Sequence, residues 1–172
     1  MPVPAPELPE FYLQPGEWRI VRGPSVLKTV LGSCVGVTFH APRLAASAMC
    51  HPMLPTHMAK PFVLSDPVAA RRYVDYVIRE MACEFDSLGA TRREVEVKLF
   101  GGADVLASSR KSATVGRMNA ETALRVLEDE GYHVLASRLG GSRGIFIEFH
   151  TDTGEVLLRK LAGTDPCILA RT

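Results

Sequence analysis

The feature that most constrains the fold of this chain is a pair of alternating apolar runs on either side of a short turn. Residues 34–39 and 46–53 alternate between apolar and polar or small side chains, and Ala-Pro-Arg-Leu at 41–44 separates them. Such alternation is typical of strands with one buried face, and proline presets the backbone of a turn. The apolar positions are Val35, Val37, Phe39, Ala46, Ala48 and Cys50.

The predicted register of this hairpin brings a thiol and an imidazole together. If the hairpin is centred on the Pro42–Arg43 bond, Cys34 lies directly opposite His51. Opposed side chains in an antiparallel pair point to the same face, with Cβ atoms about 4.5–5.5 Å apart. A register moved by one residue would exchange the faces of one strand and spoil the separation. We therefore predict that Cys34 and His51 lie side by side.

A cysteine beside a histidine has the chemistry of an activated nucleophile. A thiol with a pKa of about 8.5 is mostly protonated at neutral pH, and a neighbouring imidazole takes its proton. Gly32 and Ser33 directly precede Cys34 and indicate a tight bend whose backbone N–H groups would hold an oxyanion. Thr29, Ser33 or a backbone carbonyl would orient the imidazole. The pattern alone fits a buried cysteine and a structural histidine better than a catalytic pair.

The remaining patterns predict an α+β domain. Ser65-Asp66-Pro67 begins a helix with apolar residues at spacings of three and four up to Leu88, and Asn119 is expected to cap a second helix. Adjacent antiparallel strands favour α+β over a doubly wound fold. Further strands are expected at residues 26–31, 94–99, 132–139, 145–149 and 155–161.

Composition and charge narrow the functional classes. With 20 basic and 19 acidic residues, the chain has no electrostatic reason to bind nucleic acid or an anionic membrane. No apolar run approaches the roughly 20 residues that span a bilayer, and no secretory signal is visible. We expect a cytoplasmic protein with a flexible proline-rich arm at residues 1–20 and one domain at residues 21–172.

The cysteines do not form a metal or disulfide pattern. No Cys-x-x-Cys pair occurs, and no set of ligands has the spacing of a zinc site. We expect reduced thiols, no metal and no cofactor. The four cysteines are Cys34, Cys50, Cys83 and Cys167.

Several segments resemble the CheD family of chemoreceptor glutamine deamidases. Leu-Gly-Ser-Cys-Val-Gly-Val at 31–37 looks like the nucleophile segment of that family, and Met-Cys-His-Pro-Met-Leu-Pro at 49–55 looks like its histidine segment. The order of the blocks along the chain makes the resemblance specific. Further similar blocks lie at residues 98–103, 115–119, 139–144 and 151–156.

The resemblance implies a fold, an activity and partners. The fold would be a single-domain sandwich of largely antiparallel sheet layers with flanking helices, similar to bacterial toxin deamidases. The activity would be that of a protein-glutamine glutaminase with a Cys-His-Thr triad, acting through a thioester. Cys34 and His51 match the motifs, and Thr29 is the threonine in the expected region. The partners would be cytoplasmic helices of chemoreceptors and a CheC-type phosphatase.

Weaker candidates for substrate binding are Gly101, Gly102, Asn119 and Arg143. The glycines also fit tight turns with positive φ, Asn119 fits a helix cap, and Arg143 fits a surface charge. Two other functions stay open. One is a non-catalytic chemotaxis adaptor that binds a CheC-type phosphatase, and the other is a different thiol acyl-transfer enzyme, such as a transglutaminase-like crosslinker or a peptidase.

Overall fold

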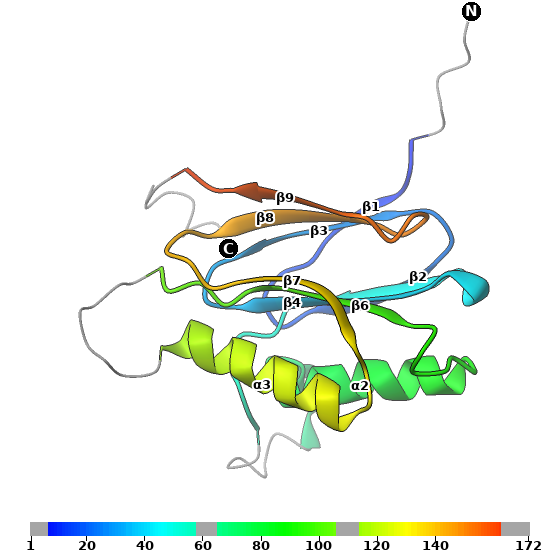
Figure 1. Ribbon diagram of the computed structural model, residues 1–172, viewed down its shortest axis with the longest axis horizontal. Helices are drawn as coiled ribbons and strands as arrows, with labels where there is room; N and C mark the ends of the chain where they lie inside the picture. Colours follow the sequence, from blue (N-terminus) through cyan, green and yellow to red (C-terminus); the bar gives the residue numbers. More distant parts are fainter. Residues whose placement is uncertain (1–6, 58–64, 106–113, 163–172) are drawn as a thin grey trace, which may run out of the picture.

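The computed structural model describes residues 7–57, 65–105 and 114–162, which form two stacked β-sheets with helices beneath one of them (Figure 1). The four-stranded sheet has the order β1-β3-β8-β9, and the five-stranded sheet has the order β2-β5-β4-β6-β7. Both sheets are mixed, because β1 runs parallel to β3 and β6 runs parallel to β7, while the other pairs are antiparallel. The predicted single-domain α+β fold is confirmed.

The elements follow one another in a simple order along the chain. The strands are β1 (Glu10–Tyr12), β2 (Trp18–Arg22), β3 (Val26–Leu31), β4 (Val35–Ala41), β5 (Ala46–Cys50), β6 (Glu96–Gly101), β7 (Val134–Leu139), β8 (Ile145–His150) and β9 (Val156–Lys160). The helices are the 3-10 turn η1 (Pro42–Leu44), α1 (Pro67–Ala70), α2 (Val74–Ser87) and α3 (Val115–Asp129).

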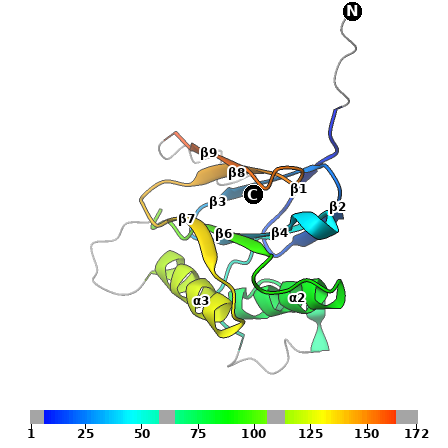
Figure 2. The same cartoon turned by 45° about the vertical axis from the view of Figure 1, so that its right-hand side comes forward.

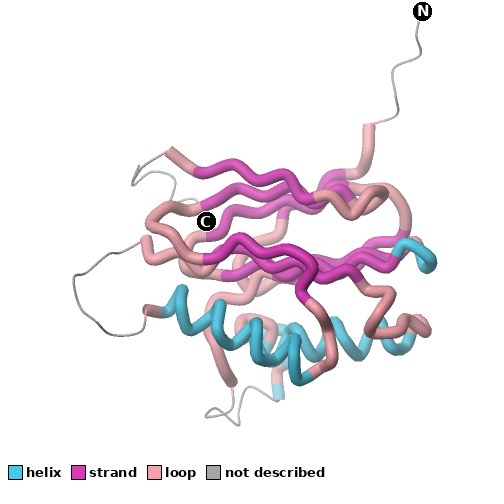
Figure 3. Tube along the Cα trace, in the orientation of Figure 1, coloured by secondary structure: helices cyan, strands magenta, loops and turns pink. Residues whose placement is uncertain are grey.

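Two apolar interiors result from this layering. Figures 2 and 3 show α2 and α3 on the outer side of the five-stranded sheet, while the four-stranded sheet covers its other side. The helix side contains Phe39, which meets Phe85 edge to face with ring centroids 5.3 Å apart. The inter-sheet side contains Leu27, Leu31 and Ile147, all fully buried. Burial of each such side chain contributes about 1.5–3 kcal/mol to folding.

The hairpin of β4 and β5 has the predicted faces but not the predicted register. All six alternating apolar residues of the hairpin belong to the cluster that packs on the helices. Ala41 pairs with Ala46 and Val37 pairs with Cys50, so the hairpin is centred between Arg43 and Leu44. The predicted centre at the Pro42–Arg43 bond is therefore wrong.

The physical reason for this register is the shape of the turn. The 3-10 turn η1 is closed by Ala45, which has φ 48° and donates its N–H to the carbonyl of Pro42. With Ala45 in this left-handed conformation, the four-residue loop runs from Pro42 to Ala45, one position later than the predicted turn at 41–44. Because the opposing residue changes by two positions, every side chain stays on its predicted face.

The helix starts also differ from the sequence-based expectation. Asp66 caps α1 as predicted, but the helix stops at Ala70 and α2 begins separately at Val74. The expected cap at Asn119 is wrong, because Thr114 accepts a hydrogen bond from the N–H of Arg117 and caps α3. Asn119 is instead a fully buried residue inside α3.

Much of the segment at residues 7–20 is integrated into the sheets. β1 lies within the stretch predicted as an arm and pairs with β3, and the following Leu13 is only 1% exposed. β2 then pairs with β5. Residues 1–6 lie outside the described ranges. Within those ranges, no helix has the length and apolar character needed to cross a membrane.

Candidate catalytic site

Cys34 lies in the turn where the chain passes from one sheet to the other. β3 ends at Leu31 in the four-stranded sheet, and β4 begins at Val35 in the five-stranded sheet. The intervening turn is held from the end of β6. Gly102 donates its N–H to the carbonyl of Cys34 at 2.8 Å, and Ala103 donates to the carbonyl of Gly32 at 2.9 Å. These bonds fix the backbone on both sides of Ser33.

Gly101 and Gly102 are required by this close approach. Their φ angles are 96° and 64°, in the left-handed region that favours glycine. A Cβ on Gly101 would lie 2.3 Å from the carbonyl oxygen of Cys34, and one on Gly102 would lie 2.8 Å from that of Gly116. The predicted positive φ is confirmed at both positions. Contact of these glycines with substrate stays a prediction.

His51 lies directly after β5 and is 2% exposed. Its N–H donates to the carbonyl of Glu17 at 2.9 Å, and its carbonyl accepts from the N–H of Gly16 at 2.7 Å. The backbone on both sides of the imidazole is therefore fixed by the turn that precedes β2.

The corrected register places Cys34 diagonally across from His51. Val35 donates its N–H to the carbonyl of Pro52 at 3.4 Å, so the hairpin pairing extends weakly past β5. Continued by one pair, the register sets Gly36 beside His51 and leaves Cys34 one diagonal away on the same face. Diagonal neighbours have Cα atoms about 7–8 Å apart, still within reach of long side chains. Among the described residues, the two side chains do not share a hydrogen bond.

Thr29 and His51 come together from the two different sheets. The inward-facing hydroxyl of Thr29 lies 2.7 Å from Nδ1 of His51 and donates to the carbonyl of Leu13 at 2.8 Å. A carbonyl only accepts, so the single hydroxyl proton of Thr29 is used there. The Thr29 oxygen must then accept from Nδ1–H of His51. This assigns the neutral imidazole to the tautomer whose Nε2 carries a free lone pair.

Burial keeps both reactive groups uncharged at rest. Burial raises the pKa of the Cys34 thiol to about 11, although its own backbone N–H opposes part of the rise. Burial lowers the pKa of His51 to about 4, and the Leu13 backbone opposes part of that shift. At neutral pH the site therefore holds a thiol and a neutral imidazole, rather than a thiolate–imidazolium pair.

Asn119 contacts the backbone of both segments that carry the candidate pair. Its Nδ2 donates to the carbonyl of Ser33 at 2.9 Å and to the carbonyl of Met53 at 2.9 Å. Because both partners are acceptors, this nitrogen must be the amide NH₂ group. Asn119 is fully buried, and its NH₂ group is used by the chain itself, while contact with substrate stays a prediction.

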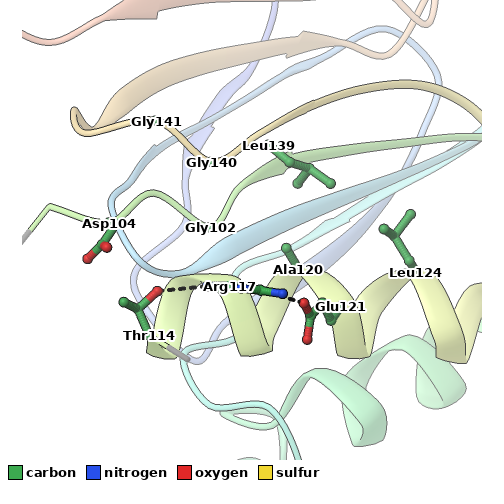
Figure 4. A pocket seen from close by; sticks show the side chains of 10 residues that line it. All are labelled: Gly102, Asp104, Thr114, Arg117, Ala120, Glu121, Leu124, Leu139, Gly140 and Gly141. Atoms are coloured by element: carbon green, nitrogen blue, oxygen red, sulfur yellow. Dashed lines mark hydrogen bonds and ion pairs between the residues drawn. The ribbon is translucent and has the colours of Figure 1, made fainter. Parts of the chain in front are cut away.

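An open groove of about 480 Å³ lies next to Gly102 (Figure 4). Gly102 lines it and also binds the carbonyl of Cys34, whereas Cys34 and His51 are not among its lining residues. The walls are α3 on one side and the loop with Gly140 and Gly141 on the other. Arg143 is exposed in the same loop, and its contact with substrate stays a prediction.

The described residues contain no cluster of three or more His, Cys, Asp or Glu side chains suited to a metal ion. Cys34, Cys50 and Cys83 are free thiols, and Cys167 lies outside the described ranges. Burial raises the pKa of Cys50 to about 12, so this thiol is unreactive near neutral pH.

Two parts of the site have no clear signal in the sequence. We use the name relay for the hydrogen bonds that run from His51 through Thr29 to the carbonyl of Leu13. Because every residue type has a backbone carbonyl, no sequence pattern marks the role of Leu13. The role of Asn119 was obscured because asparagine is also a common helix cap. The available sequence signal is the spacing of Asn119 from Ala123 and Val126, which places it on the apolar face of the helix.

Comparison with known proteins gives consistent matches over most of the chain. A family model described as CheD chemotactic sensory transduction matches residues 53–160. The chain is 43% identical over 160 residues to the probable chemoreceptor glutamine deamidase CheD 2 of Geobacter sulfurreducens, covering 93% of this chain and 95% of the relative. It is 34% identical over 149 residues to the chemoreceptor glutamine deamidase CheD of Thermotoga maritima, covering 86% and 90% of the two chains.

Proposed function

Because the chain belongs to the CheD family, we propose that it is a chemoreceptor glutamine deamidase, an amidohydrolase that converts glutamine side chains of chemoreceptors to glutamate. One observation carries the assignment of the site. The relay from His51 through Thr29 to the carbonyl of Leu13 leaves Nε2 of His51 free as a base, on the face of the hairpin that also carries Cys34.

The first half of the reaction forms a thioester. As Sγ of Cys34 attacks the δ-carbon of the glutamine side chain, Nε2 of His51 takes the thiol proton. The carbonyl oxygen becomes an oxyanion, and backbone N–H groups of the Gly32–Cys34 turn stabilise it. The imidazolium then gives its proton to the amide nitrogen, the carbon–nitrogen bond breaks, and ammonia leaves. Cys34 now carries the acyl group.

The second half of the reaction regenerates the thiol. Nε2 of His51 takes a proton from water, and the resulting hydroxide attacks the thioester carbon. The carbon–sulfur bond breaks, and the imidazolium returns its proton to the sulfur of Cys34. The sum is glutamine plus water giving glutamate plus ammonium, because the new carboxylic acid loses its proton to the released ammonia, and the receptor gains a negative charge.

Thr29 acts as a positioning residue in both halves. Its oxygen accepts from Nδ1–H of His51 and stabilises the imidazolium that forms when Nε2 is protonated. Because His51 is neutral at rest, its positive charge is needed only while the reaction is in progress. The proposal is therefore proton transfer concerted with attack, not a preformed ion pair.

The test uses a chemoreceptor cytoplasmic fragment and peptide mapping by mass spectrometry. The native protein is expected to convert specific glutamines to glutamate with release of ammonia, and Cys34→Ala is expected to abolish the conversion. Cys83→Ala is the matched control, because Cys83 is an exposed thiol on α2 outside the site. Cys83→Ala should retain full activity.

The alternative functions give different results in the same test. Crosslinked peptides with the native protein would indicate a transglutaminase-like reaction, which passes through the same thioester. Tight binding of an unmodified receptor by both the native protein and Cys34→Ala would indicate an adaptor. Binding of a CheC-type phosphatase stays a separate prediction.

A further inference from the structure

A polar side chain on the buried face of α3 is not explained by apolar packing. Asn119 has no exposed surface, and the buried face of its helix also carries Ala123, Val126 and Leu127. Its Oδ1 is buried without a hydrogen-bond partner among the described residues. An unsatisfied buried acceptor destabilises a fold. The presence of an asparagine here therefore indicates that the contacts of its NH₂ group offset this cost.

That other end joins the two segments that carry the reactive side chains. Nδ2 of Asn119 donates one hydrogen to the carbonyl of Ser33, directly before Cys34, and one to the carbonyl of Met53, two residues after His51. One amide thus fixes the distance between the Cys34 turn and the segment after β5. These segments are otherwise linked only by the weak bond from Val35 to Pro52 at 3.4 Å, among the hydrogen bonds of the described backbone.

The bond to Ser33 also determines where the N–H of Cys34 points. The carbonyl of Ser33 and the N–H of Cys34 belong to one planar peptide unit, and no cis peptide occurs in the described chain. In a trans unit the C=O and N–H bonds point in opposite directions. With the carbonyl held toward Asn119, the N–H of Cys34 must point away from α3. A hydrogen bond to the carbonyl also polarises the unit and strengthens its N–H as a donor.

We propose that Asn119 is a positioning residue that aims the backbone N–H of Cys34 at the oxyanion formed during glutamine deamidation. The inference rests on the proposed function, since an oxyanion forms only if Cys34 attacks an amide. It assigns Asn119 no contact with substrate. The side chain acts entirely through the Ser33–Cys34 peptide and through the Met53 carbonyl.

The test separates oxyanion stabilisation from thiol reactivity. Asn119→Leu and Asn119→Asp keep much of the volume of the side chain but lack its NH₂ group, and Asn119→Ala removes both. Deamidation of the receptor fragment is measured as kcat and KM. In parallel, the rate of alkylation of Cys34 by iodoacetamide is measured by mass spectrometry. Alkylation proceeds by direct displacement and forms no oxyanion.

All three variants are expected to lower kcat about 10- to 100-fold, because one oxyanion donor is worth about 10²–10³ and here it is misaimed rather than removed. KM and the alkylation rate are expected to change less than about threefold. Thr122→Val is the matched control, since Thr122 is buried on the same helix without bonding either segment. It should leave kcat unchanged.

Several results would overturn the inference. These are kcat within twofold of the native value in Asn119→Leu, an alkylation rate that falls in parallel with kcat, or loss of folding in every Asn119 variant, which would make the residue structural. A native protein without deamidase activity would refute the proposed function and this inference together. Native activity with an unaffected Asn119 variant would refute this inference alone.

Discussion

The two ends of the β4–β5 hairpin carry the same arrangement of side chains with different consequences. At one end, Nδ1 of His51 lies 2.7 Å from the hydroxyl of Thr29, which donates to the carbonyl of Leu13. At the other end, Nδ1 of His40 lies 2.8 Å from the hydroxyl of Ser47, which lies 3.3 Å from the carbonyl of Thr151. Both relays are buried, and both select the tautomer with a lone pair on Nε2.

The difference lies in what surrounds each ring. At His40, the backbone of Gly154 packs so closely that an added Cβ would lie 3.0 Å from Nε2. Phe149 meets the same ring edge to face, with centroids 6.3 Å apart. At His51, the hairpin register continued past β5 places Cys34 one diagonal away on the same face. An imidazole held by a hydroxyl and a carbonyl is therefore not a catalytic site unless a nucleophile can reach its other nitrogen.

The largest effect is expected from removing each histidine in turn. His51→Gln should lower kcat for deamidation about 10²–10⁴-fold, because general base catalysis is lost. His40→Gln should leave kcat within about threefold and lower only the melting temperature. Steady-state kinetics and thermal unfolding of both variants provide the comparison. Equal losses of kcat would show that the two ends are not functionally distinct.

The next largest effect should be the loss of folding stability as the pH falls. The unfolded pKa of histidine is about 6.5, and burial lowers that of folded His51 to about 4. Between these values the unfolded state binds more protons, so stability present above pH 6.5 is lost as the pH falls toward 4. The loss from His51 is about 3 kcal/mol.

This prediction is checked by urea unfolding of the native protein and His51→Gln across pH 4–7. The variant should have a shallower slope, while the carboxylates contribute equally to both proteins and cancel. Burial also lowers the pKa of His40, so His40→Gln should reduce the slope in the same direction. A native slope unchanged in His51→Gln would contradict the buried neutral state of this imidazole.

The smallest effects are expected when the hydroxyl groups of Thr29 and Ser47 are removed. Thr29→Val keeps the shape of the side chain but removes the acceptor for Nδ1–H, and should lower kcat about 10-fold through misoriented His51. Thr29→Ser should restore most of the activity. Ser47→Ala should destabilise the fold by about 1–3 kcal/mol without changing kcat, since it leaves the buried Nδ1–H of His40 unpaired. A Thr29→Val enzyme with native kcat would remove the relay from the mechanism.

Much of this comparison could be predicted from the sequence, and the reason is local. Alternation along a strand has a period of two, so it determines which side chains share a face even when the register is wrong. That is why the sequence predicts Cys34 and His51 on one face although its predicted hairpin centre is wrong. The register itself depends on Ala45 adopting a left-handed conformation, which no residue type at that position signals.

What the sequence by itself determined, then, is the α+β class, the faces of the hairpin and the candidate pair of Cys34 and His51. The family resemblance implied Thr29 as a third member, but only the tertiary structure decided which hydrogen bonds surround the pair. The carbonyl of Leu13, the hydroxyl of Thr29 and the amide of Asn119 come from the segment after β1, from β3 and from α3. Hydrogen bonds between distant elements are set by how layers pack in space, and neither periodicity nor spacing along the chain records that packing.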